Sequence, residues 1–476
     1  MKNILLPRRT FLKSSLTGMV AAAYNRSVFA AEKGNAVSST KYDPTWESLD
    51  AHQCPEWFHD AKIGMYFHWG VCSVPAWAPR SDTISYAEWY WHSMNDPNNP
   101  TWQYHRDTYG ADFTYDDFIP LFKAERYDPQ EWVNFAWKSG ARYIFVNAKH
   151  HDGFCMWPSK LTNRTAYVMG PKRDLIGPLA DAARAKGMKF GFYYSFYEWY
   201  NPLYTGKPHP YTGLIPVDSY VENFMIPQIK ELIDWYHPDF LYFDGEWDFP
   251  HDFWKSPDFV AYYYNQAAQR KQEVLVNDRY GKGSRGHHGD VYNVEYHYGS
   301  ENEGLLTHTW SYWRGVGKTF GYNRDTNPED CLTPKELIHM VVDGVSKNGN
   351  FDINVGPTAA GLITDEERMP LLELGKWLGI NGEAIYGTRI WGKEVYEDIR
   401  YTCKKGHVYA VFLKWQGEKF FCPAVKAVRG SVVSMLGVSG DLEWNQNDNG
   451  ITIMYPPYKS RPAQCAYAWV FKIRIA

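Results

Sequence analysis

Short apolar and aromatic runs alternate with stretches of helical period between Ile63 and Gly356. Each run is short enough for one strand and ends in polar residues. Asp128 followed by Pro129 predicts a helix start, and the sequences Thr333–Glu336 and Thr364–Glu367 predict capping boxes that open two later helices. Strands that alternate with helices form a parallel sheet with helical cover. The runs are Ile63–Gly70, Tyr143–His150, Lys189–Tyr194, Phe240–Asp244, Val274–Asn277 and Phe351–Val355.

No glycine-rich phosphate loop follows the first run, which favours a (β/α)8-type barrel over a nucleotide-binding open sheet. After about Tyr386 the pattern changes to short alternating runs separated by Gly, Asn, Asp and Pro. We therefore predict an α/β fold with a catalytic barrel over residues 31–389 and an antiparallel β-sandwich over residues 390–476. The runs of this second part are His407–Trp415, Lys419–Phe421, Ser431–Leu436 and Ile451–Tyr455.

Residues 1–30 have the features of a targeting segment. Arg8-Arg9-Thr10-Phe11-Leu12-Lys13 precedes a weakly apolar stretch, and Val28-Phe29-Ala30 provides a small-residue cleavage site. This order predicts a twin-arginine signal peptide cleaved after Ala30, hence a bacterial protein that is periplasmic or secreted. The alternative is a chance arginine pair ahead of a short amphipathic helix.

The amino-acid composition narrows the classes of possible binding partner. The 476 residues include 50 basic and 54 acidic ones, for a net charge of -4, without a long run of either sign. This balance argues against nucleic acid and anionic membranes as partners. The seven cysteines lack CxxC spacing and are odd in number, so neither a disulfide framework nor a zinc site is indicated. The aromatic content of 17% suits a site that stacks rings on sugars, although large barrels also bury many aromatics.

Polar residues at strand ends are the first candidates for chemistry, because the reactive groups of a barrel project from the C-terminal ends of its strands. Five such endings occur in register, which predicts one shared pocket. They are Phe67-His-Trp-Gly70, Lys149-His-His-Asp-Gly153, Tyr242-Phe-Asp-Gly-Glu-Trp247, Asn277-Asp-Arg-Tyr280 and Tyr292-Asn-Val-Glu-Tyr-His297.

Three chemistries could use these endings. A metal centre would draw on His68, His150, His151, His297 and Asp244, but HxH and HExxH spacings are absent, and adjacent histidines on an extended chain point to opposite sides. Acyl transfer would need a nucleophile elbow such as GxSxG, which is also absent. Glycoside hydrolysis needs two carboxyl groups, neutral donors and aromatic walls, all of which are present. We therefore predict a glycosidase without a metal or other cofactor.

At these residues the chain resembles the α-L-fucosidases of glycoside hydrolase family 29. The likeness extends from about Trp57 to Trp391 and rests on motifs in the family's order. The motifs are Lys62–Gly70 with Ser73–Trp77, Ala87–Trp91, Ala148–Phe154, Phe243–Trp247, Val276–Arg279, Val294–Tyr296, Phe320–Asn323, and Asn354–Pro357 followed by Gly379–Tyr386. The resemblance implies a barrel with a C-terminal β-sandwich, and an exo-acting retaining enzyme that removes terminal α-L-fucose from a fucosylated glycan.

The resemblance also implies roles for individual residues. Asp244 is the nucleophile, and Glu295 matches the position of the proton donor in some members; others use a Glu after a later Trp, where this chain has Trp310-Ser311. Glu88 and Glu303 are the alternatives for the donor. Retention would place the two carboxyl groups roughly 5 to 5.5 Å apart. The residues implied in substrate binding are His68, Glu88, Trp89, His150, His151 and Arg279, with Tyr242 and Phe320 as walls around the fucose methyl group.

Several readings remain open. Arg279 could instead pair with its neighbour Asp278, and Tyr242 stands where relatives often carry Trp. Glu246 could be a pocket wall or a residue that supports the wall from behind. At the level of function, the alternatives are a catalytically silent fucose-binding protein and a hydrolase specialised for sulfated fucans. Segment Lys282–His288 is the candidate sulfate subsite for the latter, or else a solvated loop.

Overall fold

The computed structural model describes residues 41–475, except residues 82–83, 205–217, 297–307, 393–395 and 458–460. The predicted signal peptide, His297 and Glu303 lie outside the described residues. Among the residues that are described, no helix is long and apolar enough to cross a membrane.

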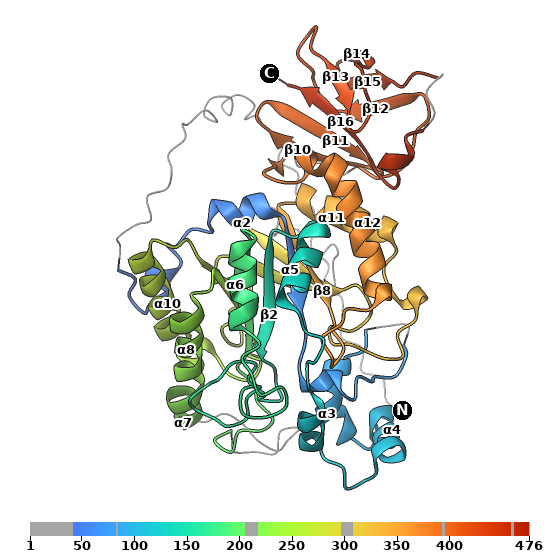
Figure 1. Cartoon of the computed structure of the whole chain (residues 1–476). Coiled ribbons are helices and arrows are strands. Elements are labelled where there is room, and N and C mark those ends of the chain that lie inside the picture. Colours follow the sequence, from blue (N-terminus) through green and yellow to red (C-terminus); the bar gives the residue numbers. More distant parts are fainter. Residues whose placement is uncertain are drawn as a thin grey trace, which may run out of the picture. The chain divides into compact units, whose positions relative to one another are not determined.

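Eight parallel strands form one curled sheet in the order β5-β4-β3-β2-β1-β8-β7-β6, with helices such as α5, α6, α8 and α10 outside it (Figure 1). This arrangement confirms the predicted barrel-type α/β fold. The strands are β1 Ile63–Phe67, β2 Tyr143–Lys149, β3 Lys189–Ser195, β4 Phe240–Asp244, β5 Leu275–Val276, β6 Tyr292–Glu295, β7 Trp310–Gly315 and β8 Gly349–Val355.

The seam between β5 and β6 is held together mainly by hydrogen bonds of side chains. The backbone contacts described across it are one parallel bridge, between Asn277 and Val291, and a hydrogen bond from the Asp290 N–H to the Val276 carbonyl oxygen at 3.1 Å. The Asn277 amide donates to Asn293 Oδ1 at 2.7 Å, and Asp278 Oδ1 accepts from the Asn293 N–H at 3.1 Å. Asp290 Oδ2 accepts from the Val276 N–H at 2.9 Å. Amide and carboxylate groups therefore replace a backbone ladder at this point.

Two of the three predicted helix caps form. The Asp128 carboxylate accepts from the N–H groups of Gln130 and Glu131, and Thr333 and Glu336 make a reciprocal capping box. The third prediction is wrong in its bonding: α12 begins after Thr364, but the Thr364 side chain caps no N–H group. The Glu367 carboxylate instead accepts from the Gly356 N–H at 3.1 Å, because the end of β8 leaves that donor within its reach.

The helices around the sheet occupy the segments between the strands. The longer ones are α4 Pro100–Tyr109, α5 Pro129–Lys138, α6 Gly177–Ala185, α8 Ile226–Tyr236, α10 Ser256–Arg270, α11 Pro334–Ser346 and α12 Asp365–Asn381. The short ones are α1 Trp46–Leu49, α2 Glu56–Ala61, α3 Tyr90–Met94, α7 Asp218–Tyr220 and α9 His251–Trp254; a π-helix, Val221–Met225, leads into α8.

The C-terminal part consists of two antiparallel sheets, in the orders β13-β16-β11-β10-β9 and β12-β15-β14. Their facing side chains, including Phe412, Phe420, Ile453 and Phe471, form a core of their own. The antiparallel second part is therefore confirmed, while the exact boundaries of the domains stay a prediction. The strands are β9 Arg389–Ile390, β10 Ile399–Lys404, β11 His407–Phe412, β12 Lys419–Pro423, β13 Val433–Met435, β14 Glu443–Asn447, β15 Gly450–Met454 and β16 Trp469–Arg474.

Candidate active site

A cavity of about 620 Å³ opens at the C-terminal ends of the barrel strands. Its volume is in the range of small-molecule sites. It brings together nine of the ten site residues predicted from the sequence, all but Tyr242. The lining residues are Tyr66, His68, Tyr86, Glu88, Trp89, His150, His151, Tyr193, Asp244, Trp247, Arg279, Arg285, Glu295, Tyr296, Trp313 and Phe320.

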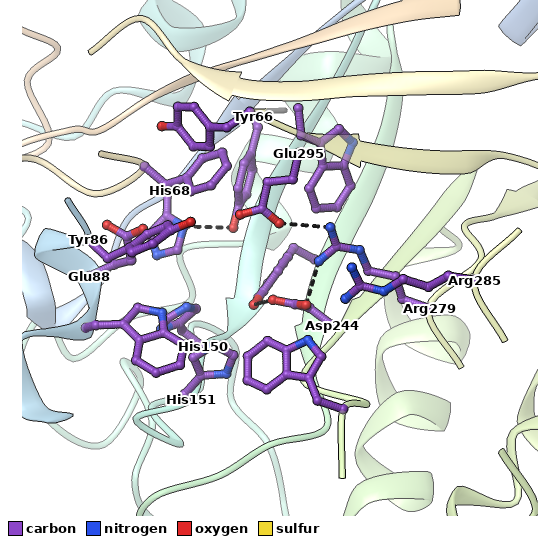
Figure 2. A pocket seen from close by; sticks show the side chains of 16 residues that line it. Tyr66, His68, Tyr86, Glu88, His150, His151, Asp244, Arg279, Arg285 and Glu295 are labelled. Atoms are coloured by element: carbon purple, nitrogen blue, oxygen red, sulfur yellow. Dashed lines mark hydrogen bonds and ion pairs between the residues drawn. The ribbon is translucent and has the colours of Figure 1, made fainter. Parts of the chain in front are cut away.

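Arg279 joins the two carboxylates of the cavity. It follows β5, while Asp244 ends β4 and Glu295 ends β6. One terminal nitrogen of the guanidinium donates to Asp244 Oδ1 at 2.7 Å and the other to Glu295 Oε2 at 2.8 Å (Figure 2). The alternative pairing with Asp278 is wrong, because Asp278 accepts backbone N–H groups instead. A single buried cation thus fixes both acidic side chains.

Asp244 is held in its charged form. Burial by itself raises the pKa of this carboxyl group, but the charge of Arg279 and a 2.7 Å hydrogen bond from the Tyr193 hydroxyl outweigh it, so that the pKa falls below its ordinary value. An ionised carboxylate at a cavity wall can act as a nucleophile or a base.

Glu88 lies on the opposite side of the cavity in the 3-10 helix Ala87–Trp89 (Figure 2). Burial raises its pKa to about 7, although its carboxylate accepts from the Gly321 N–H at 2.9 Å. The adjoining Phe320 carbonyl accepts from the Asn354 amide, which belongs to β8. β8 thereby positions both Glu88 and the Phe320 ring.

Three histidines from two strand ends line the cavity, with ring centroids 4.7 Å apart for His68 and His150 and 4.0 Å apart for His150 and His151. Burial holds the pKa of each well below its usual value, so the rings are neutral. The expectation that His150 and His151 point to opposite sides is wrong, because β2 ends at Lys149 and the chain turns there.

Candidate segment Lys282–His288 contributes one residue to the cavity. Arg285 lines it and donates through Nε to Glu246 Oε1 at 2.7 Å. Glu246 is buried and is not a lining residue, so of its two alternatives the supporting residue agrees with the structure and the wall does not. Glu246 instead holds Arg285 in place, and the next residue, Trp247, forms part of the wall.

Tyr242 is the one predicted site residue that does not line the cavity, which corrects the expectation of an aromatic wall there. It points to the same side as Asp244 but lies one layer deeper, fully buried, and donates to Asp352 Oδ2 at 3.3 Å. Trp313 donates to the same oxygen at 2.8 Å and, unlike Tyr242, reaches the cavity.

Six further aromatic residues line the cavity although they were not among the predicted site residues: Tyr66, Tyr86, Tyr193, Trp247, Tyr296 and Trp313. A period of two could have found Tyr66, because it shares an inward face with His68. Trp313 belongs to β7, whose sequence Trp-Ser-Tyr-Trp-Arg-Gly has no aliphatic run to mark it as a strand.

The histidines of the cavity also raise the question of a metal site. Within the described part of the chain, no group of three or more His, Cys, Asp or Glu side chains is arranged to hold a metal ion. Three of the five residues considered for a metal site, Asp244, His68 and His151, have hydrogen-bond partners within the protein, namely Arg279, Tyr66 and Ser195.

Comparison with protein families finds two matches. The family model for α-L-fucosidase matches residues 29–383, and the model for the α-L-fucosidase C-terminal domain matches residues 393–474. Among curated proteins, human tissue α-L-fucosidase is 36% identical over 442 residues, which cover 91% of this chain and 92% of that protein. Human plasma α-L-fucosidase is 36% identical over 452 residues, covering 92% and 93%.

Solved structures agree with this. A Thermotoga maritima α-fucosidase in complex with a mechanism-based inhibitor is 36% identical, with a TM-score of 0.79, and covers 91% of this chain and 100% of that one. The same enzyme in complex with fucose gives 35% and 0.78 over the same shares. Neither alternative function of the sequence analysis, a silent fucose-binding protein or a hydrolase specialised for sulfated fucans, gains support from these comparisons.

Proposed function

This chain belongs to the α-L-fucosidase family and is a glycoside hydrolase, and on that premise we propose that it removes terminal α-L-fucosyl residues from glycans with retention of configuration. The observation that carries the proposal is the pair of carboxyl groups, Asp244 and Glu295, held by one guanidinium at the wall of a cavity large enough for a sugar. Two carboxyl groups at one site are what glycoside hydrolysis requires.

In the first step Asp244 attacks the anomeric carbon of the fucosyl residue. The glycosidic bond breaks, Glu295 gives its proton to the departing oxygen, and a fucosyl ester of Asp244 forms. Arg279 and the Tyr193 hydroxyl support this role, because they keep Asp244 ionised and direct its oxygens. The aglycone leaves as an alcohol.

In the second step Glu295, now a carboxylate, takes a proton from water. The oxygen of this water attacks the anomeric carbon, the ester bond to Asp244 breaks, and Asp244 is released as a carboxylate. Two inversions give net retention. The 28% side-chain exposure of Glu295, against 12% for Asp244, supports the idea that Glu295 is the group that meets water and leaving group.

Recognition of fucose combines polar groups with an aromatic wall. His68, His150, His151 and Glu88 offer hydrogen-bonding groups to the sugar hydroxyls, and Trp89 offers a ring face. A 6-deoxy sugar carries a methyl group that would gain about 0.8 kcal/mol on the Phe320 ring. A hydroxymethyl group at that point would lose water contacts without gaining a partner, which favours fucose over galactose.

We further propose that the protein is exported through the twin-arginine route and acts in the periplasm or outside the cell. The support is the order of features in residues 1–30. Replacing Arg8 and Arg9 by Lys should leave the protein in the cytoplasm with its N-terminus uncleaved, as fractionation and N-terminal sequencing would reveal; unchanged export would disprove this route.

Turnover of 4-nitrophenyl α-L-fucoside tests the chemistry. We expect Asp244→Ala to abolish it, and azide to rescue Asp244→Gly with formation of a β-fucosyl azide. On a fucoside with a poor leaving group, such as methyl α-L-fucoside, Glu295→Ala should lose activity by roughly 100-fold or more. Asp252→Asn, which alters a carboxylate that is 86% exposed, is the control and should keep full activity. Inverted product, or full activity in Glu295→Ala, would contradict the mechanism.

A further inference from the structure

His151 and Ser195 form a hydrogen-bond chain that ends in the protein backbone. His151 Nδ1 lies 2.6 Å from Ser195 Oγ, and Ser195 Oγ donates to the Tyr197 carbonyl oxygen at 2.8 Å. Ser195 is the last residue of β3 and is fully buried. It pairs in register with Asp244 on the neighbouring strand, so its position is set by the sheet.

The direction of each bond in this chain follows from counting hydrogens. A carbonyl oxygen can only accept, so the single hydroxyl hydrogen of Ser195 is used by Tyr197. Ser195 Oγ must then accept from His151, which requires a hydrogen on Nδ1. If Ser195 instead donated its hydrogen to His151, its Oγ would face the Tyr197 carbonyl oxygen at 2.8 Å with no hydrogen between them. That would be an unfavourable contact of two buried acceptors.

The second ring nitrogen, Nε2, belongs to a side chain that borders the cavity. His151 is one of the lining residues, and its ring is packed among Trp89, Trp247 and Trp199, with centroids 5.1, 5.4 and 5.4 Å away. These rings prevent it from turning over. Burial and the positive charge of Lys149 hold the pKa of His151 well below its usual value, so the ring carries one hydrogen and not two.

We infer that Ser195 is a positioning residue that fixes His151 as the Nδ1–H tautomer, which makes Nε2 a hydrogen-bond acceptor that the substrate must meet with a hydroxyl or N–H donor. The assignment of that donor to a fucose hydroxyl rests on the proposed function, whereas the tautomer itself does not. His68 differs, because its Nδ1 faces the Tyr66 hydroxyl at 3.0 Å, a group that can either donate or accept.

The tautomer can be measured on the free protein. In protein labelled with ¹⁵N-histidine, long-range ¹H–¹⁵N correlations at neutral pH should give the Nδ1–H pattern for His151, assigned by the signals lost in His151→Gln. Ser195→Ala should move the ring toward the Nε2–H form. An Nε2–H or doubly protonated pattern in the wild type would overturn the inference, whether or not the protein turns over fucosides.

Kinetics test the consequence for substrate. Ser195→Thr and Ser195→Val have the same shape and differ only in the hydroxyl group. We expect Ser195→Val to lower kcat/KM for 4-nitrophenyl α-L-fucoside by roughly 3- to 10-fold relative to Ser195→Thr, the effect of one hydrogen bond. Equal values in the two variants would overturn the positioning role. Should neither variant fold, the wild-type spectrum still decides.

A substrate-side probe identifies the partner of Nε2. Methyl α-L-fucosides with one hydroxyl replaced by hydrogen or by fluorine are compared as inhibitors, because fluorine can weakly accept but never donate. At the hydroxyl that donates to His151, both replacements should weaken inhibition by the same factor. If the fluoro analogue retains binding at every position, His151 does not act as an acceptor.

Discussion

At the scale of single residues, the placement of one guanidinium decides the charge of the site. Arg279 is 2% exposed and contacts both carboxylates, so neither can move without breaking an ion pair. It also opposes the tendency of burial to neutralise Asp244. Asp244, the proposed nucleophile, therefore depends for its ionisation on Arg279, a neighbour that takes no bond-forming part in the proposed reaction.

Arg279→Gln should change the pH profile as well as the rate. Without the positive charge the pKa of Asp244 rises, so less of it is ionised at acidic pH and the acid limb of kcat/KM shifts to higher pH. We expect a loss of roughly 100-fold near neutrality, the scale of removing one preorganised electrostatic contact. Arg279→Lys, which keeps the charge, should shift the limb less. An unmoved acid limb in Arg279→Gln would contradict this account.

The sequence identifies residues that end strands better than residues that lie within them. His68, His150, Asp244 and Glu295 stand where an apolar run gives way to polar residues, a signal visible in one dimension. Tyr193 and Trp313 lie inside strands, where the same aromatic residue can face core or cavity, and only the depth of the layer separates the two outcomes. Tyr242 was misplaced for that reason.

At the scale of elements, a buried ion pair ties β2 to the loop after β3. Lys149 Nζ lies 2.5 Å from Glu198 Oε2 and 3.1 Å from the Tyr220 hydroxyl, with both charged side chains almost fully buried. In the same region the backbone N–H of Trp199 donates to the His151 carbonyl oxygen at 2.7 Å. This attachment holds the turn that presents His150 and His151.

Lys149→Met should therefore be strongly destabilising. It leaves Glu198 buried without its counterion, which costs about 3–5 kcal/mol in the free energy of unfolding measured with urea. The double variant Lys149→Met/Glu198→Leu should recover much of this loss. Lys376→Met, which breaks a pair of equal length whose lysine is 72% exposed, should cost less than about 1 kcal/mol. Equal effects of the two single variants would refute the argument.

Element boundaries show where local pattern is sufficient and where it is not. The run Phe240–Asp244 coincides with β4, and Asp128 begins α5 as its capping chemistry requires. Val274–Asn277 shortens to Leu275–Val276 because pairing at the seam is taken over by side chains, which no periodicity records. The reciprocal capping box at Thr364 does not form, because the Glu367 carboxylate accepts from the Gly356 N–H just after β8.

At the scale of the whole molecule, side chains from β11 and β16 that do not belong to the core of the C-terminal part pack into the apolar core of the barrel. The cluster that contains Trp377 of α12 also contains Tyr409, Val411 and Val470 from β11 and β16. The Trp377 indole N–H donates to the Ala468 carbonyl at 3.0 Å. The C-terminal part is thus held to the barrel by side-chain packing as well as by the covalent chain.

Trp377→Ala should weaken this junction. Loss of a buried indole costs about 3–5 kcal/mol, while Trp377→Phe, which keeps a ring and loses the hydrogen bond, should cost distinctly less. Urea unfolding gives both values, and limited proteolysis should reveal faster cleavage between barrel and sandwich in Trp377→Ala. Because Trp377 does not line the cavity, kcat of the folded fraction should be unchanged; a lower kcat would imply coupling between junction and active site.

The seam between β5 and β6 has a consequence for how such an enzyme can diversify. Arg279 stands just beyond one side of the seam and Glu295 on the other, while Asn277, Asp278, Asp290 and Asn293 join the two sides. Exchanging one of these side chains would alter the distance between Glu295 and Asp244, the proposed proton donor and nucleophile, while the strands stay in place. New leaving groups could then be accommodated over generations by small changes at a joint, without redesign of the scaffold.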